Sequence, residues 1–231
     1  MNNRSLISYS FGTAWKLFKS NWKVMVGVAL IMFLVGTGYG LVEVLLTEAG
    51  MAGVAVSLLS FLLSAWLSLG MFRVFLDIFD GKKPSIMVLF SQAGLILYFL
   101  GASILYGLMV VVGLVFLVVP GFFLAIRFYF YNVLIVDKEL GPIKALKASW
   151  NLTKGHWWSI FGLTLLLALF NIAGALALIV GLLVTIPVSW MAMICAYRFL
   201  SSSSVRVKPE QVDRSQEPLP ESFVETQSSI Q

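Results

Sequence analysis

The sequence predicts an all-α integral membrane protein that has six transmembrane helices and two interfacial amphipathic helices. Of its 231 residues, 59% are hydrophobic and 12% are charged, which is far from the balance of a soluble domain. Apolar runs long enough to cross a bilayer recur through residues 1–200, and this stretch is the predicted membrane domain. A short segment rich in Trp and Lys also occurs twice, each time directly before such a run.

The six spans follow one another along the chain. Residues 22–46 and 52–76 form the first two. Residues 93–136 are too long for one crossing, and we divide them at Pro120-Gly121 because this pair readily interrupts a helix. Residues 157–199 are also of double length, with a turn predicted near Gly174 to Gly181. Four spans remain an alternative if either double run is inserted in part.

The distribution of basic residues predicts which side of the membrane each loop occupies. Apart from Arg127, the Lys and Arg residues fall in one alternating set of segments, and the segments between them carry none. The positive-inside rule then places both termini in the cytoplasm, which requires an even number of spans. This set is Arg4, Lys16, Lys19, Lys23, Arg73, Lys82, Lys83, Lys138, Lys144, Lys147, Lys154, Arg198, Arg206, Lys208 and Arg214. The pI of about 9.4 is explained by this topology and by anionic lipid, so we expect no nucleic-acid partner.

Two segments have the pattern of helices that lie in the headgroup region. Residues 5–22 alternate an apolar face with a polar face at helical spacing, and residues 142–156 repeat this design after Gly141-Pro142. Trp and Lys together favour the interface, because the ring lies at headgroup level and the ammonium reaches anionic lipid. The alternative is that both segments are ordinary anchors that fix topology. The residues concerned are Trp15, Lys16, Lys19, Trp22, Lys147, Trp150, Lys154 and Trp157.

The recurrence of the Trp-Lys segment suggests a parallel internal repeat. Residues 15–22 match residues 150–157 with an offset of 135 positions, so that Trp15, Lys19 and Trp22 fall on Trp150, Lys154 and Trp157. Each copy leads into two spans, the second of which ends near an arginine, Arg73 or Arg198. The central pair of spans would then be inserted between two units of the same orientation.

Arg127 is the one strong base within a predicted span. A charge near the bilayer centre is costly, so it usually faces the protein interior and has a partner. Asp137 is ten residues further on, about 15 Å along a straight helix, and cannot contact Arg127 directly within it. Asp77, Glu43 and Asn171 are candidate partners on other spans. Arg127 could bind an anion or a lipid phosphate, form a structural ion pair, or reach to the interface.

The sequence contains no motif that indicates catalysis. It has one histidine, His156, and one cysteine, Cys195, neither at the spacing of a metal site, and it lacks the nucleophile, phosphate-binding and dinucleotide-binding motifs. We therefore expect no enzymatic activity, no catalytic residue, no metal and no cofactor. Residues 201–231 are rich in Ser, Gln, Glu and Pro and are predicted to form a disordered cytoplasmic tail.

The stretch VVPGFFLAIRFYF at residues 118–130, Asp137, and GPIKALKASWNLTKGHW at residues 141–157 resemble a group of bacterial multi-pass membrane proteins. That group is similar to the membrane domain fused to some glycerophosphoryl diester phosphodiesterases. The resemblance covers about residues 118–160 and implies a bacterial inner-membrane protein of undetermined biochemistry. The phosphodiesterase domain has no counterpart here, so its activity is not implied.

These observations predict a non-enzymatic inner-membrane protein that organises lipid or scaffolds a partner at the cytoplasmic leaflet. Anionic phospholipids are the expected partners, and a homo-oligomer or another membrane protein is left open. The alternative is a small transporter or channel subunit that has Arg127 on an anionic-substrate path. The candidate lipid-binding or anion-binding residues are Arg127, Asp137, Lys147, Lys154, Trp150, Trp157, Lys16, Lys19, Trp15 and Trp22.

Overall fold

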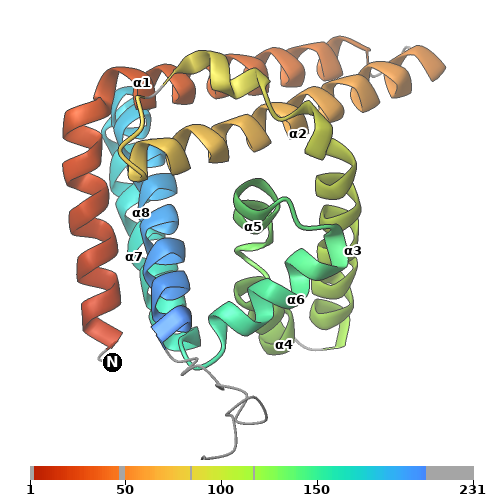
Figure 1. Cartoon of the computed structure of the whole chain (residues 1–231). Helices are drawn as coiled ribbons and strands as arrows, with labels where there is room; N and C mark the ends of the chain where they lie inside the picture. The colour runs from red at the N-terminus through yellow and green to blue at the C-terminus, as the bar shows by residue number, and fades with distance from the viewer. Residues whose placement is uncertain (1–2, 47–49, 84, 117, 207–231) are drawn as a thin grey trace, which may run out of the picture.

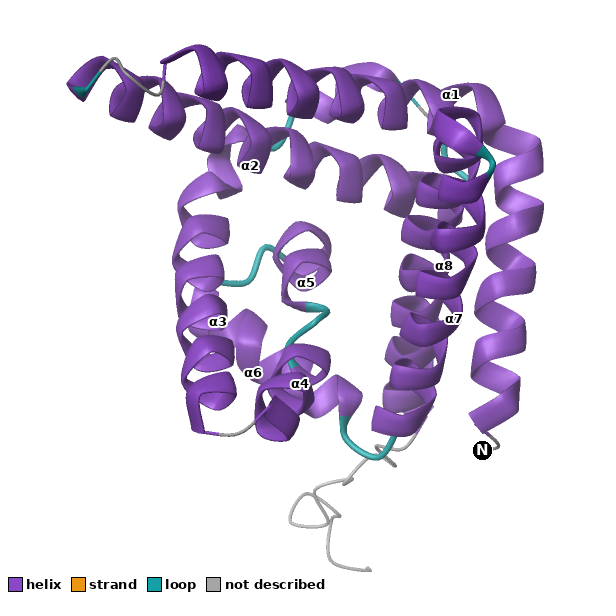
Figure 2. Ribbon diagram, turned by 180° about the vertical axis from the view of Figure 1, so that it is seen from behind, coloured by secondary structure: helices purple, strands orange, loops and turns teal. Residues whose placement is uncertain are grey.

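The computed structural model describes residues 3–46, 50–83, 85–116 and 118–206. Over these residues the chain is helical and contains no strand (Figure 2). Its elements are α1 (Asn3–Leu46), α2 (Met51–Phe79), η1 (Ile86–Phe90), η2 (Ala93–Leu95), α3 (Ile96–Phe116), α4 (Val118–Arg127), α5 (Tyr131–Lys138), α6 (Pro142–Thr153), α7 (Trp157–Leu176) and α8 (Leu178–Arg206).

Six helical stretches are long and apolar enough to cross a membrane, as the sequence predicted. They are Leu6–Val42, Gly53–Phe79, Ile86–Phe116, Pro120–Lys138, Trp157–Leu176 and Gly181–Ser202. The turn between the last two falls at Ala177, within the predicted interval. The third and fourth divide slightly earlier than predicted, since α3 ends at Phe116 and Pro120 lies in the first turn of α4, where proline is tolerated.

The predicted interfacial helix at residues 5–22 is not a separate element. It forms the first part of α1, which changes direction at Asn21, where φ is −123° and ψ is 24°. The buried positions Leu6, Ser10, Ala14 and Phe18 follow a four-residue spacing and face the protein, beside α7 and α8 (Figure 1). This part of α1 therefore packs against helices, whereas the sequence predicted that it lies along the membrane surface.

The second predicted amphipathic segment is a separate helix, α6, although it ends at Thr153 rather than at residue 156. It buries Ala145, Leu146, Ser149 and Thr153. The chain then breaks at Gly155, whose φ of +82° suits glycine because no Cβ crowds the backbone there. The predicted tail also begins later than expected, because α8 continues to Arg206; residues 207–231 lie outside the described part.

The apolar helices run in two main directions. The part of α1 after Asn21 pairs with α2, and this pair lies across the bundle formed by α7, α8 and the first part of α1 (Figure 1). The view from behind shows the same crossing (Figure 2). In this view α3 runs in a direction similar to that of α7 and α8 but lies on the opposite side of the molecule. Helices in such different directions cannot all cross one flat bilayer along its normal.

Several close contacts in the bundle depend on glycine, and two of them show how. A Cβ at Gly70 of α2 would overlap the carbonyl group of Leu89 in η1, and a Cβ at Gly174 of α7 would overlap the side chain of Thr185 in α8. By contrast, Gly36, Gly38, Gly40 and Gly107 have no atom within 4 Å of such a Cβ. Close packing is therefore concentrated at a few positions rather than along every glycine-rich stretch.

We expect Gly70→Ala to destabilise the fold by about 1–3 kcal/mol, because the backbone of η1 would have to move away from α2. Gly107→Ala is the matched control and should be neutral or stabilising by up to about 1 kcal/mol, since alanine favours the helix and meets nothing. Thermal unfolding of both variants in detergent measures the difference. Equal melting temperatures for the two variants would show that this contact is not tight.

Candidate functional site

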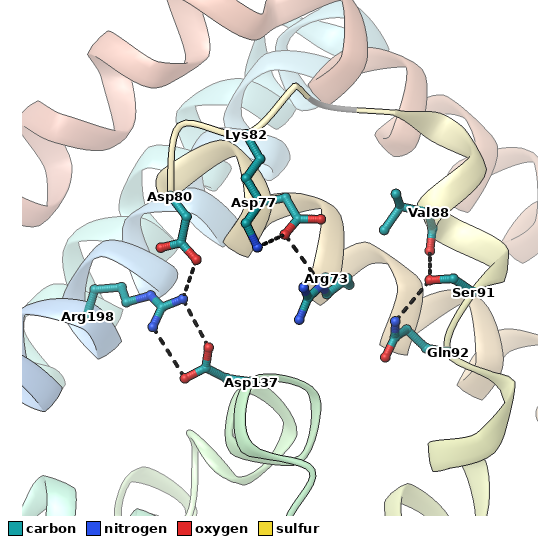
Figure 3. Close-up of polar contacts among 9 residues, drawn as sticks. All are labelled: Arg73, Asp77, Asp80, Lys82, Val88, Ser91, Gln92, Asp137 and Arg198. Carbon is teal, nitrogen blue, oxygen red and sulfur yellow. Dashed lines mark hydrogen bonds and ion pairs between the residues drawn. The ribbon is translucent and has the colours of Figure 1, made fainter.

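Arg198 of α8 joins two carboxylates that come from distant parts of the chain. Its Nη2 atom lies 2.7 Å from Asp80 Oδ2 and 3.0 Å from Asp137 Oδ1, and its Nη1 donates to Asp137 Oδ2 at 3.3 Å. Asp80 is at the end of α2 and Asp137 is in α5, so one guanidinium connects three helices (Figure 3). A planar guanidinium suits this role because it can donate to several oxygens at once.

Asp137 is held from a second side by the residue next to Arg198. The Tyr197 hydroxyl, on a fully buried side chain, donates to Asp137 Oδ2 at 2.5 Å. The carboxylate therefore has hydrogen bonds from two adjacent residues of α8, and its side chain is 13% exposed. This geometry fixes the position of α5 against α8.

A second group of charges lies nearby, on α2 and in the loop that follows it. Asp77 Oδ1 is 3.4 Å from Arg73 Nε and 3.3 Å from Lys82 Nζ, and Figure 3 shows both contacts beside the Arg198 cluster. The two groups together contain three carboxylates and three cations. Their formal charges cancel, which favours a structural role over attraction of a charged ligand.

Arg127 is stabilised by aromatic rings rather than by a carboxylate. Its guanidinium carbon lies 5.0 Å from the centre of the Phe123 ring and 4.7 Å from that of Trp150, the geometry of cation–π contacts. Its Nη1 donates to the Trp150 carbonyl at 3.5 Å.

None of the partners considered from the sequence is observed for Arg127. Asp137 binds Arg198, Asp77 binds Arg73 and Lys82, and Asn171 donates to Ser189 Oγ. The Glu43 side chain lies outside the described part of the structure. Arg127 and Asp137 lie in different helices, α4 and α5, and belong to different clusters.

Ser149 and Thr153 attach α6 to the end of α4. Their hydroxyls donate to the Arg127 carbonyl at 3.0 and 3.1 Å, and Ser149 Oγ accepts from the Phe130 amide at 3.2 Å. A helix end leaves carbonyls without partners in the helix, and these hydroxyls supply them. Sequence reasoning did not identify this role; the signal for it is a pair of hydroxyl residues four positions apart on the face of α6 that carries Ala145 and Leu146.

The structure divides the ten candidate residues among four places. Trp150 and Trp157 join Arg127 at the corner of α4, α6 and α7, where the Trp157 ring lies 5.7 Å from Phe123. Asp137 lies in the Arg198 cluster. Lys147 and Lys154 are exposed on α6 and the loop after it, and the other four candidates surround the bend of α1: Trp15, Lys16, Lys19 and Trp22.

The exposed lysines differ from the interior cations. Lys16, Lys19, Lys23, Lys144, Lys147 and Lys154 are all exposed, and within the described residues none has a carboxylate at ion-pair distance. Lys19 lies 5.6 Å from the Trp15 ring centre, and Lys23 lies 6.0 Å from that of Trp22. These ammonium groups are therefore free to bind an external anion.

We expect Arg198→Ala to destabilise the fold by about 2–4 kcal/mol, because it leaves the largely buried Asp137 and the nearby Asp80 without their cation. Lys82→Ala is the control and should cost less than about 1 kcal/mol, since Lys82 is largely exposed and Asp77 keeps Arg73. The melting temperatures of purified variants in detergent compare the two. A similar decrease in melting temperature in both variants would show that the Arg198 contacts contribute no more to stability than the Lys82 contact does.

Arg127→Lys should destabilise by about 1 kcal/mol although the charge is kept, because an ammonium lacks the planar guanidinium surface that contacts the Phe123 and Trp150 rings. Lys147→Arg, an exposed change on the neighbouring α6, is the control and should leave the melting temperature unchanged. If the lysine variant is as stable as the parent protein, the positive charge alone accounts for the contribution of residue 127 to stability.

The sequence model of DUF7847, described as a domain of unknown function, matches residues 59–220. No curated protein and no solved structure matches the chain. The match provides no link to the membrane domain of glycerophosphoryl diester phosphodiesterases, so that resemblance stays a prediction. Because the matched residues make up more than half of the sequence, the chain belongs to the uncharacterised DUF7847 family.

Proposed function

We propose that this protein is a non-enzymatic membrane protein that binds anionic phospholipid headgroups and thereby organises lipid or scaffolds a partner. The observation that carries the proposal is the set of exposed lysines without carboxylate partners. Cations next to apolar helices attract anionic headgroups, each contributing about 1 kcal/mol near such a surface. Exposed aromatic rings beside them, Trp22 at 52% and Trp158 at 69%, fit the headgroup region.

The lysines fall into two sets at opposite ends of α7. Gly162 of α7 lies against Ile7, and Phe170 lies against Phe11, so the first part of α1 runs parallel to α7. Lys16, Lys19 and Lys23, the bend set, therefore lie toward the end of α7. Lys144, Lys147 and Lys154, the α6 set, precede its beginning. This separation differs from the expectation that both Trp-Lys segments share one face.

We infer that the α6 set faces the cytoplasm of a bacterial cell, at its inner membrane. The beginning of α1 and the end of α8 lie together, since the Tyr9 and Phe199 rings are 5.2 Å apart. That contact supports two termini on one side, as an even number of spans requires. The end of α6 lies at the same end of the bundle (Figure 1). Because the bend set gives the opposite end three lysines as well, this inference rests on the position of the two helix ends and not on a difference in charge between the ends of the bundle.

The proposed parallel repeat has local support. Asn21 and His156 are equivalent in the repeat, and both precede its second tryptophan. Their backbone angles are close, with φ and ψ of −123° and 24° for Asn21 and −119° and 15° for His156. The backbone thus leaves helical geometry at the equivalent position in both copies, although the break in the second copy also includes Gly155.

The alternative of a transporter or channel subunit has less support. An anionic substrate would need access to the Arg127 guanidinium. The rings of Phe123 and Trp150 lie close to it, with their centres 5.0 and 4.7 Å from the guanidinium carbon, and restrict that access. A structural position for Arg127 explains these contacts without a substrate.

The two lysine sets provide matched variants of equal charge change. We expect replacement of Lys144, Lys147 and Lys154 by Gln to weaken retention of phosphatidylglycerol, by roughly 1 kcal/mol for each lysine. Native mass spectrometry of the protein released from nanodiscs measures the bound lipid. Replacement of Lys16, Lys19 and Lys23 by Gln tests the bend set in the same way.

Lys82→Gln is the control, because Lys82 is already paired with Asp77, and it should retain lipid as the parent protein does. Loss of lipid from the α6 variant alone would assign binding to the proposed cytoplasmic end. Unchanged retention in both triple variants would overturn the proposed function.

A further inference from the structure

A cavity in the interior of the bundle is lined mainly by aromatic rings. It lies between α2, α3, α5 and α8 and has a volume of about 160 Å³. A cavity of about 150 Å³ holds a molecule of the size of benzene, so this one has room for a group of about six non-hydrogen atoms. Its aromatic and amide lining consists of Phe72, Tyr106, Tyr129, Tyr131, Trp190 and Asn132.

The residues that line the cavity disfavour binding of an anion. Within the described residues, no lysine or arginine side chain lines the cavity, so a phosphate or carboxylate would enter without a counter-ion. Ring faces carry negative electrostatic potential and attract cations. Five such rings around one space form the kind of environment that recognises alkylammonium groups.

Asn132 contributes a hydrogen-bond acceptor that is without a partner. Its Oδ1 atom is buried and accepts no hydrogen bond from any residue that the structure describes. Buried polar atoms of this kind are uncommon and call for an explanation. The Asn132 side chain lines the cavity, so a rotation of its amide would bring this oxygen to an ammonium N–H placed there.

The rings are held in position by contacts with each other and with neighbouring side chains. The Tyr131 hydroxyl is 3.0 Å from Ser103 Oγ, and the Tyr106 ring packs at 5.1 Å from that of Tyr131. Phe75 packs edge-on against Trp190 at 6.0 Å. Little rearrangement is therefore needed to form the site, which reduces the entropic cost of binding.

Trp190 also lines an apolar groove of about 300 Å³ between α1 and α8. The groove contains Met32, Phe33 and Ile186 and has almost no polar surface. One indole thus separates a space suited to an ammonium group from one suited to an alkyl chain.

We propose that the aromatic cavity binds an ammonium group that carries small alkyl substituents. The source is either the headgroup of an ethanolamine or choline phospholipid or a free amine of the same chemistry. This site is independent of the exposed lysines, which would bind the opposite charge. The two proposals can therefore fail separately.

The test titrates the full-length protein, in nanodiscs of phosphatidylglycerol, with tetramethylammonium and with methylammonium, using ligand-observed NMR. Tyr106→Leu should weaken both ligands by about tenfold, because a ring face is lost. Tyr106→Phe keeps the ring and should bind tetramethylammonium as the parent protein does. Tyr98→Leu, at an exposed tyrosine of the same helix, is the control and should change neither affinity.

Asn132→Leu separates the two kinds of contact. It should weaken methylammonium, which donates hydrogen bonds, and leave tetramethylammonium unchanged, because that ion has no N–H. A neutral analogue, 2,2-dimethylpropane, should bind far more weakly than tetramethylammonium. Equal binding of the neutral analogue, or binding that Tyr106→Leu does not weaken, would overturn the proposal.

A second arm identifies the source of the ammonium. The titration is repeated in nanodiscs that contain phosphatidylethanolamine together with phosphatidylglycerol. Weaker apparent binding of tetramethylammonium there would show that the lipid headgroup occupies the cavity. Unchanged binding would assign the site to a free amine.

Discussion

The contact of Arg198 with Asp80 and Asp137 is the constraint on which the arrangement of the bundle depends. It joins the end of α2, the short helix α5 and the last long helix α8, which are far apart in sequence. Hydrophobic packing alone fixes such contacts weakly within a membrane, because lipid is as apolar as the helix surfaces. A guanidinium with two specific carboxylates has one satisfactory geometry, and Tyr197 restricts it further by binding the same aspartate. Polar contacts thus determine how these helices meet.

Arg127 shows a second way to accommodate a cation inside an apolar protein. Phe123 and Trp150 cover its guanidinium, and the hydroxyls of α6 satisfy its carbonyl. The two arginines therefore have different consequences for α5. Arg198 binds a side chain of α5, whereas Arg127 ends the helix that precedes it and attaches that end to α6. Between these two fixed points the chain passes through Tyr129 and Tyr131, so the aromatic cavity lies where the backbone is held at both ends.

The number of apolar helices and the turn at Ala177 could be predicted, because length and hydropathy are properties of contiguous residues. The lateral contacts could not. The sequence shows that Arg127 and Asp137 are charged, but their partners come from elements that are adjacent in space only after folding. The burial of the first part of α1 was missed for a related reason. Its apolar stripe was assigned to the membrane, whereas Ile7, Phe11 and Trp15 pack against the protein core. The buried face also includes Ser10 and Ala14, whose small side chains allow close approach.

The two copies of the Trp-Lys segment have similar local backbone geometry but different neighbouring helices. Both copies bend the backbone at the same position, Asn21 or His156. Before the bend, however, one copy packs along α7 and α8, and the other packs across α3, α4 and α5. Similar residues therefore encode the change of direction, and the neighbouring helices decide where each arm lies. The first part of α1 and the helix α6 end at opposite ends of α7, so equivalent lysines have different surroundings. Binding of lipid at one lysine set therefore does not imply binding at the other.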